Sequence, residues 1–331
     1  MKGLLNQIVC GDCIAVLNGV GEPGFADLVF ADPPFNIGYQ YDKYEDNVEK
    51  DRYLHWTRDW MAACVRILRP HGSFYIAIGD EYAANVRMIG EELGLTLRNW
   101  IIWHYTFGQQ TKTMFARSHA HIFYFVRDAK NFTFNDYAIR VPSDRQLIYN
   151  DSRADARGKM PDDVWTDYSR VCGTFKERLG WHPCQMPELL LARIISVSSN
   201  EGDVVLDPFV GSGTTAAVAH MLGRDYVGID ISEDYVQAVR ERIAEMDAPR
   251  QTQDGPFGSS LRAREAFELK RLFVEVGIPA CRILGNSKLL NLYAGQLAMR
   301  MNNGHRYPPD ALIPELKGLT TWVGRKQKLS C

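Results

Sequence analysis

Short apolar runs alternate with amphipathic segments along most of the first 246 residues. An apolar run that ends at Pro or Gly is typical of a buried strand, whereas apolar residues at 3.6-residue spacing are typical of a helix. Runs at 25–31, 73–78 and 121–126 alternate with helical patterns at 51–68 and 81–93. This alternation predicts an α/β fold with a doubly wound, parallel sheet.

The alternation is interrupted once and ends before the C-terminus. Residues 127–180 are polar and lack sustained periodicity, and a loop of that length in a compact domain is usually functional. Strands and helices resume at about residue 187. We therefore predict one large domain over residues 1–250, with a segment at about 105–180 inserted in it, and a basic, mostly helical C-terminal extension over residues 257–331.

The composition is that of an ordinary globular protein. Of the 331 residues, 46% are hydrophobic and 24% are charged, which excludes collagen-like, coiled-coil and disordered chains. No run of about 18 apolar residues occurs, and the first residues lack the apolar stretch of a signal peptide, so neither a membrane span nor secretion is expected. The seven cysteines are scattered, and only Cys10 and Cys13 have metal-like spacing. Without a second pair, we predict no metal site and a reducing, cytoplasmic location.

Charge is distributed unevenly along the chain. The net charge is −2, but residues 101–180 carry 12 Lys and Arg against 9 Asp and Glu, and residues 257–331 carry 12 against 5. Residues 1–100 and 181–256 are acidic. Solvated surfaces account for such a pattern, and so does a polyanionic partner that contacts the basic segments.

A glycine-rich turn lies between a predicted strand and a predicted helix, with the sequence Asp207-Pro208-Phe209-Val210-Gly211-Ser212-Gly213-Thr214-Thr215. Glycines allow a ligand to approach the backbone closely, and the N–H groups at a helix start favour an anionic ligand group. The Lys of a phosphate-binding loop is missing, and the dinucleotide pattern is incomplete because Ala216 stands where its third Gly belongs.

Asp207 and Asp230 end consecutive predicted strands, 23 residues apart along the sequence. A carboxylate at the second strand end can bind the two hydroxyls of a ribose. An amino acid joined to a nucleoside fits all of these features, with its carboxylate at the helix start, its ammonium near Asp207 and its ribose at Asp230. We therefore predict S-adenosylmethionine as the cofactor. A structural strand-turn-helix with solvated carboxylates is the alternative.

The sequence Asp32-Pro33-Pro34-Phe35 ends another predicted strand. Ligands of open α/β sheets bind at such strand ends, so this turn is expected to face the glycine-rich turn. The exocyclic amine of a base is a poor nucleophile. The Asp32 carboxylate and the Pro33 carbonyl can accept its N–H groups and direct its lone pair at a methyl group, while Phe35 stacks on a base turned out of the duplex. A stiff turn with a buried Phe is the alternative.

Together these motifs resemble those of the DNA amino-methyltransferases. Their order, with the reactive motif early, a recognition region in the middle and the cofactor motif late, is similar to the beta group, which includes the cell-cycle-regulated adenine methyltransferase and many restriction-modification enzymes. The resemblance covers about residues 7–246. It implies a mostly parallel, seven-stranded, Rossmann-like methyltransferase sheet, and S-adenosylmethionine-dependent chemistry in the domain over residues 1–250.

Two shorter segments extend the resemblance. His182-Pro183-Cys184-Gln185-Met186-Pro187 resembles a family segment that lines the cofactor pocket, although Cys184 and Met186 depart from it, and Gly11-Asp12-Cys13-Ile14 resembles one that contacts the cofactor adenine. The catalytic residues so implied are Asp32, Pro33, Pro34 and Phe35. Those implied for cofactor binding are Asp12, Cys13, His182, Gln185, Asp207, Phe209, Gly211, Ser212, Gly213, Thr214 and Asp230.

The substrate so implied is the N6 amine of an adenine in double-stranded DNA, because in this family an Asp at the first motif position usually accompanies adenine and a Ser usually accompanies cytosine N4. DNA contacts are expected from the middle segment, through Lys112, Arg117 and His119. A cytosine-N4 or RNA methyltransferase and a catalytically silent DNA-binding module are the alternatives. The resemblance also implies a bacterial or phage-encoded protein, and a homodimer is common in the group.

The C-terminal extension matches no motif of the family. Arg262, Arg264, Lys270 and Arg271 fall close together on a predicted helix, and Arg325, Lys326 and Lys328 form a second basic cluster. We expect these cations to contact DNA phosphates. Packing or dimerisation is the alternative role, because an apolar helix face is formed by Leu289, Leu290, Leu292, Leu297 and Met301.

Overall fold

The computed structural model describes residues 3–109, 111–149, 151–173, 175–247 and 260–319. The chain divides into two compact units. Unit 1 comprises Met1–Phe134 and Asp163–Ala248, and unit 2 comprises Asn135–Asp162 and Pro249–Cys331. Residues 135–162 are thus grouped with the C-terminal helices, whereas the sequence analysis placed them in the segment inserted in the large domain.

Unit 1 is built on an eight-stranded sheet of order β1-β8-β7-β2-β3-β5-β4-β6. The first five strands in this order, β1, β8, β7, β2 and β3, are parallel to one another. The strand β5 is antiparallel to both of its neighbours, β3 and β4, and β6 is parallel to β4. The strands are β1 (Gln7–Cys10), β2 (Ala26–Ala31), β3 (Leu68–Ile78), β4 (Thr96–Gln109), β5 (Arg117–Val126), β6 (Val164–Trp165), β7 (Val204–Asp207) and β8 (Asp225–Asp230).

The mostly parallel α/β sheet confirms the predicted fold class. The predicted count of seven strands is wrong by one. At one edge, β6 contains only two residues and pairs with β4 through Val164 and Trp165. A strand of that length has no periodicity that a sequence pattern can reveal. The central strand β2 is buried along its whole length, which explains its nearly continuous apolar sequence.

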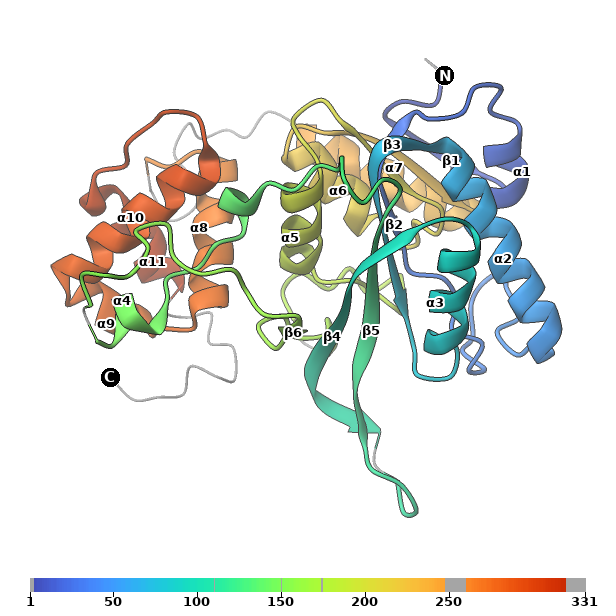
Figure 1. Cartoon of the computed structure of the whole chain (residues 1–331), viewed down its shortest axis with the longest axis horizontal. Coiled ribbons are helices and arrows are strands. Elements are labelled where there is room, and N and C mark those ends of the chain that lie inside the picture. The colour runs from blue at the N-terminus through green and yellow to red at the C-terminus, as the bar shows by residue number, and fades with distance from the viewer. Residues whose placement is uncertain (1–2, 110, 150, 174, 248–259, 320–331) are drawn as a thin grey trace. The chain divides into compact units, whose positions relative to one another are not determined.

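Helices cover both faces of this sheet. Figure 1 shows α2 and α3 on one face and α5 and α6 on the other. The helices are α1 (Cys13–Asn18), α2 (Lys50–Ile67), α3 (Ala83–Glu92), α5 (Glu188–Ser198), α6 (Thr214–Met221) and α7 (Glu233–Asp247). In α2, Trp60, Met61 and Cys64 of the predicted pattern are buried, and Tyr53 extends this buried face by two turns.

Unit 2 is helical around an apolar core of its own. Its elements are η1 (Asp136–Ala138), α4 (Asp144–Leu147), α8 (Ala263–Val276), α9 (Ala280–Leu284), α10 (Ser287–Met301), η3 (Pro309–Leu312) and α11 (Ile313–Leu319). The apolar face predicted at 289–301 packs in this core, where Leu289, Leu290 and Leu297 are buried and Leu292 and Met301 pack against them. In both units, no helix of the described residues has the length and apolar character that crossing a membrane requires.

Two buried arginines, each paired with a Glu of its own segment, connect the two segments of unit 2 through hydrogen bonds to backbone carbonyls. Arg271 lies 2.7 Å from Glu268 and donates to the Ala138 carbonyl at 2.6 Å. Arg300 pairs with Glu275 at 2.5 Å and donates to the Arg140 carbonyl at 2.8 Å. The expectation that Arg271 contacts DNA phosphates is therefore wrong, because this guanidinium is buried among carboxylates. The cluster at residues 325–328 lies outside the described residues.

Candidate active site

Acidic residues follow the carboxyl ends of five neighbouring parallel strands in unit 1. The strands β1, β8, β7, β2 and β3 are adjacent in this order. One edge of the sheet therefore gathers the side chains that end or follow them, which are Asp12, Asp230, Asp207, Asp32 and Asp80. Ligands of open α/β sheets bind at this edge.

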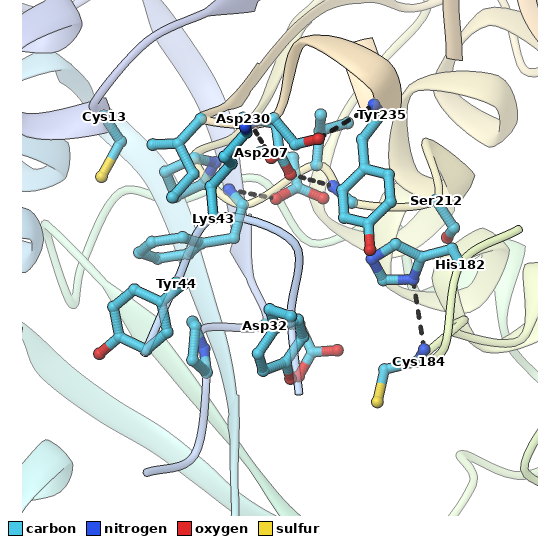
Figure 2. A pocket seen from close by; sticks show the side chains of 18 of the residues that line it. Cys13, Asp32, Lys43, Tyr44, His182, Cys184, Asp207, Ser212, Asp230 and Tyr235 are labelled. Carbon is cyan, nitrogen blue, oxygen red and sulfur yellow. Dashed lines mark hydrogen bonds between the residues drawn. The ribbon is translucent and has the colours of Figure 1, made fainter. Parts of the chain in front are cut away.

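A pocket at this edge collects most of the residues of the two predicted motifs. Figure 2 shows Asp32, Asp207 and Asp230 around this pocket, with His182 beside Tyr235. The predicted site residues that line it are Asp12, Cys13, Asp32, Pro34, His182, Asp207, Phe209, Gly211, Ser212, Thr214 and Asp230. We call it the first pocket.

Asp207 and Asp32 line this pocket, and neither carboxyl group forms an ion pair with the described residues. Burial raises the pKa of Asp207 to about 7, although the N–H of Phe209 donates to it at 3.0 Å. Burial and the neighbouring Asp207 raise the pKa of Asp32 to about 7 as well, and Arg170 opposes this rise. Among the described residues, no hydrogen bond or ion pair engages the Asp32 carboxyl group. A cation or an N–H donor is therefore the ligand group that both residues favour.

The glycine-rich turn is held by the Asp230 carboxylate and by close packing at its two glycines. Gly211 has φ +46°, and its N–H donates to the Asp230 carboxylate at 3.0 Å. A Cβ on Gly211 would lie 2.9 Å from Nε2 of His182, so this glycine allows the His182 ring to approach the turn. Gly213, with φ +75°, does not line the pocket, and a Cβ there would lie 2.4 Å from Val239 of α7. It serves helix packing.

His182 lies buried in the wall of this pocket as a neutral ring. Burial lowers the pKa of His182 to about 4. Its Nδ1 accepts the backbone N–H of Cys184 at 3.3 Å, so Nε2 carries the proton and faces the turn. Gln185, predicted to bind cofactor, instead donates to the Glu177 carbonyl and accepts the Leu179 N–H, and it does not line the first pocket. It fixes the loop that presents His182.

A second pocket shares a wall with the first. Both are lined by Asp32, Tyr41, Cys184 and Met186. The second pocket also contains Pro33 and Phe35, and its far side is formed by side chains of β4, β5 and the loop after β3. The Phe35 ring lies against Gly79, where a Cβ would approach it to 3.1 Å. The four residues of the reactive motif thus lie between two cavities.

The comparison with known proteins places this arrangement in a family. A model of the DNA methylase family matches residues 26–241. The type II methyltransferase M.HpaI of Haemophilus parainfluenzae is 39% identical over 238 residues, which cover 72% of this chain and 74% of that protein. The DNA adenine methyltransferase YhdJ of Escherichia coli K12 is 38% identical over 244 residues, covering 71% and 82%.

This chain belongs to the DNA methylase family. The fold agrees: the putative DNA modification methylase TTHA0409 of Thermus thermophilus, solved as a complex with S-adenosyl-L-methionine, superposes with a TM-score of 0.53 at 22% identity. The superposition covers 74% of this methylase and 97% of that chain. The match of the family model ends before unit 2 resumes at Pro249.

The side chains of this methylase that were predicted to contact DNA have different surroundings. Lys112 is exposed beyond the end of β4, and His119 lines the second pocket. Arg117 is exposed but pairs with Glu81 at 2.5 Å and with Asp80 at 3.5 Å. In unit 2, Arg262 is the exposed N-cap of α8, and Arg264 is partly buried.

Three side chains beside the second pocket have the composition of a metal site. Candidate ligand atoms of Asp80, His119 and His121 lie within 4.8 Å of one another. However, Nδ1 of His121 accepts the indole N–H of Trp100 at 2.9 Å, and a Trp can only donate. Nε2 of His121 therefore carries a proton and donates it to Asp80 at 3.2 Å. A metal-ligating His normally donates from its other nitrogen, so the cluster is better described as a hydrogen-bond network.

Sequence reasoning missed a loop that closes the first pocket. Tyr41, Asp42, Lys43 and Tyr44 line it, and Ser232 donates to Asp42 at 2.7 Å. Three tyrosines within six residues, beginning four positions after the Phe of Pro-Pro-Phe, were an available signal. Arg170 was also missed. It lies in the second pocket with its guanidinium 5.8 Å from the Tyr105 ring centre, and the sequence around it has no periodicity.

Proposed function

We propose that this methylase transfers a methyl group from S-adenosylmethionine to the N6 amine of an adenine that is flipped out of double-stranded DNA. The observation that carries the proposal is the position of Asp32 in the wall shared by two pockets. Cofactor in the first pocket and base in the second would meet at this carboxylate. The similarity to the DNA adenine methyltransferase YhdJ supports adenine as the base. Cytosine N4 is the alternative.

The first pocket fits an amino acid joined to a nucleoside. The buried Asp207 has a pKa raised to about 7 and gains an ion pair from an ammonium group. Asp230 keeps acceptor capacity for ribose hydroxyls while its oxygens take the N–H groups of Gly211 and Ser232. Phe209 and Trp56 supply apolar surface, with ring centres 5.6 Å apart. When bound, S-adenosylmethionine supplies an electrophilic methyl group.

Asp32 prepares the amine for attack. Ionised, it accepts one N–H of the base amine, and the carbonyl of Pro33 accepts the other, which concentrates the lone pair on nitrogen. The carbonyl of Pro34 is already occupied, because Tyr53 donates to it at 2.7 Å and so fixes the turn. Bound S-adenosylmethionine would supply the methyl group for the new C–N bond, and its sulfur would keep the electron pair of the C–S bond that breaks. The amine then carries an excess proton, which the weakly acidic Asp32 is suited to accept.

Labelled-methyl transfer tests the class of substrate. Purified protein with methyl-labelled S-adenosylmethionine should label unmethylated duplex DNA and leave RNA and protein unlabelled. Incorporation into RNA or protein alone would contradict the proposal, and absence of labelling from all three would support the silent module. Sequencing the modified DNA maps the recognition site, which then defines a short duplex substrate.

Cofactor affinity is expected to depend on pH. The pKa of Asp207 is raised to about 7 in the free protein, so the anion that attracts an ammonium group is populated only above that pH. Affinity for S-adenosylmethionine should rise roughly tenfold from pH 6 to pH 8. Calorimetry on Asp207→Asn should show weaker binding that is nearly independent of pH over this range. An unchanged pH dependence in the variant would assign the effect to another group.

We also propose that Arg262 contacts the DNA backbone. Removing one phosphate contact lowers the slope of log affinity against log salt by about 0.9. Arg262→Gln should show this smaller slope on duplex DNA of any sequence, while the capping bond from its backbone N–H to Glu265 is kept. Arg87→Gln, which removes an exposed Arg paired with Glu91, is the control. Equal salt slopes for wild type and Arg262→Gln would contradict the contact, and the role of α8 would then be to pack in the core of unit 2.

A homodimer remains a proposal for the assembly of this methylase. It is supported only by the resemblance to the beta group. Sedimentation equilibrium with and without duplex DNA measures the mass directly, and a monomer in both conditions would exclude it.

A further inference from the structure

Phe115 is almost fully exposed to solvent. The exposed fraction of its side chain is 97%, and the adjacent Met114 is 61% exposed. Both lie in the connection between β4 and β5, which Figure 1 shows extending beyond the rest of the sheet. An isolated exposed apolar residue needs no explanation, but a large ring at the end of a projecting hairpin does.

The end of this hairpin is braced around Thr111. The hydroxyl of Thr111 accepts the N–H of Met114 at 3.2 Å and donates to the Met114 carbonyl. Arg117, two residues after Phe115, is the first residue of β5, and its backbone lies opposite that of Gln109 in the β4–β5 pair. These bonds hold the backbone on both sides of Phe115, so its ring is presented outward from a supported turn.

The charge of the hairpin matches a polyanion. Residues 93–127 contain no Asp or Glu, but they include Arg98, Lys112, Arg117 and Arg127. The whole chain carries a net charge of −2, so this segment differs from its average. Only two of these cations flank the exposed ring, namely Lys112, which is exposed, and Arg117, which pairs with Glu81 and Asp80. Cations beside an exposed apolar ring favour DNA over an apolar protein surface as the partner.

The same hairpin forms a wall of the second pocket. Tyr105, Arg117 and His119 line that pocket together with Asp32 and Phe35. Phe115 is separated from Arg117 by a single residue. When a DNA duplex delivers a base to Asp32, the Phe115 ring would therefore reach the neighbouring bases of that duplex.

We propose that Phe115 is a wedge that enters the base stack of DNA beside the target nucleotide and stabilises the flipped conformation. The inference rests on the proposed function. Extruding a base leaves a gap and removes stacking from its neighbours, and an inserted apolar side chain restores part of that contact. Phe115 is thus a positioning residue, because it acts on the duplex and not on the reacting atoms.

The test compares Phe115→Ala with wild type on two duplexes that carry the mapped site. One duplex is fully paired, and the other has an abasic site opposite the target base, so that extrusion costs little. Phe115→Ala should lower kcat/KM roughly 10- to 100-fold on the paired duplex and less than about threefold on the abasic one. Phe115→Trp, which keeps a large ring, should stay close to wild type on both.

Controls separate the wedge from other roles. Ile148→Ala removes an exposed apolar side chain of unit 2 and should leave both rates unchanged. Affinity of Phe115→Ala for S-adenosylmethionine should also be unchanged. Equal losses on the two duplexes, or activity within twofold of wild type on the paired one, would overturn the inference. So would a dimer that dissociates on Phe115→Ala in sedimentation, because the ring would then contact a second copy. If the wild-type protein labels no DNA, the proposed function fails. If the wild-type protein labels DNA, the comparison of the two duplexes tests only the role of Phe115.

Discussion

Asp32→Ala should reduce methyl transfer roughly 10²–10³-fold, corresponding to ~3–4 kcal/mol of lost transition-state stabilisation, which is the typical cost of removing one preorganised acceptor or donor. The Asp32 carboxyl group lies in the wall shared by both pockets and makes no hydrogen bond to the described residues. Its acceptor capacity is therefore available to the amine of the substrate. Single-turnover rates with saturating cofactor and DNA measure the effect.

Loss of folding is not expected to explain this result. The pKa of Asp32 is raised to about 7 by burial and by Asp207, so its contribution to stability is present below its unfolded pKa and is lost as the pH rises through 7. At pH 8 the ionised carboxylate destabilises the free protein, and Asp32→Ala should be at least as stable as wild type. Affinity for S-adenosylmethionine should change only a few-fold.

Asp59→Asn provides the matched control for charge. It removes one exposed carboxylate from α2, away from the residues that line the two pockets. Its transfer rate should equal that of wild type. Turnover of Asp32→Ala within a few-fold of wild type would contradict the assigned mechanism, since no other residue of the motif offers a charged acceptor.

Gly211→Ala should lower affinity for S-adenosylmethionine roughly 10- to 100-fold, since forcing an extra methyl group into a packed site typically costs about 1–3 kcal/mol. The new Cβ would lie 2.9 Å from Nε2 of His182, and the residue has φ +46°, which favours glycine. From the sequence alone, a side chain here is expected to meet the ligand directly. The structure indicates that it would displace His182, another wall of the same pocket.

Gly24→Ala separates backbone strain from the effect on the pocket. Gly24 also has a left-handed backbone, with φ +72°. Apart from its chain neighbours, no atom of the described residues lies within 4 Å of the point that a Cβ would occupy. Both variants should lose stability from backbone strain, and Gly211→Ala should lose more because of its contact with His182. Only Gly211→Ala should lose cofactor affinity. Calorimetry and thermal unfolding on the two proteins measure these effects. Equal cofactor affinities for both variants would place the cofactor away from the glycine-rich turn.

The core of unit 1 was predictable from sequence because its signals are local. Buried parallel strands such as β2 are nearly continuous apolar runs, and α2 repeats its buried residues at helical spacing. The edge strand β6 and the grouping of residues 135–162 with the C-terminal helices were not predictable. The latter depends on side chains far apart in sequence, such as Arg271 and its bond to the Ala138 carbonyl.

Motif residues of the candidate site were predictable for a similar reason. Asp32, Asp207 and Asp230 end strands, and parallel topology brings strand ends together whatever lies between them in sequence. The cofactor contacts predicted for Gly213 and Gln185 stay predictions. Neither residue lines the first pocket, and each contacts a neighbouring segment, α7 or the loop around residue 177. Arg271 was misassigned since sequence alone does not distinguish an exposed cation from one buried among carboxylates.

The identity of the methylated nucleoside tests the central claim most directly. Duplex DNA labelled by the wild-type protein is digested to nucleosides, which are separated by chromatography and identified by mass. The account predicts that the label is found in N6-methyl-2′-deoxyadenosine and that the Asp32→Ala protein yields almost none. Label in N4-methyl-2′-deoxycytidine would contradict the assignment of adenine, and label in neither nucleoside would contradict the amine chemistry at Asp32.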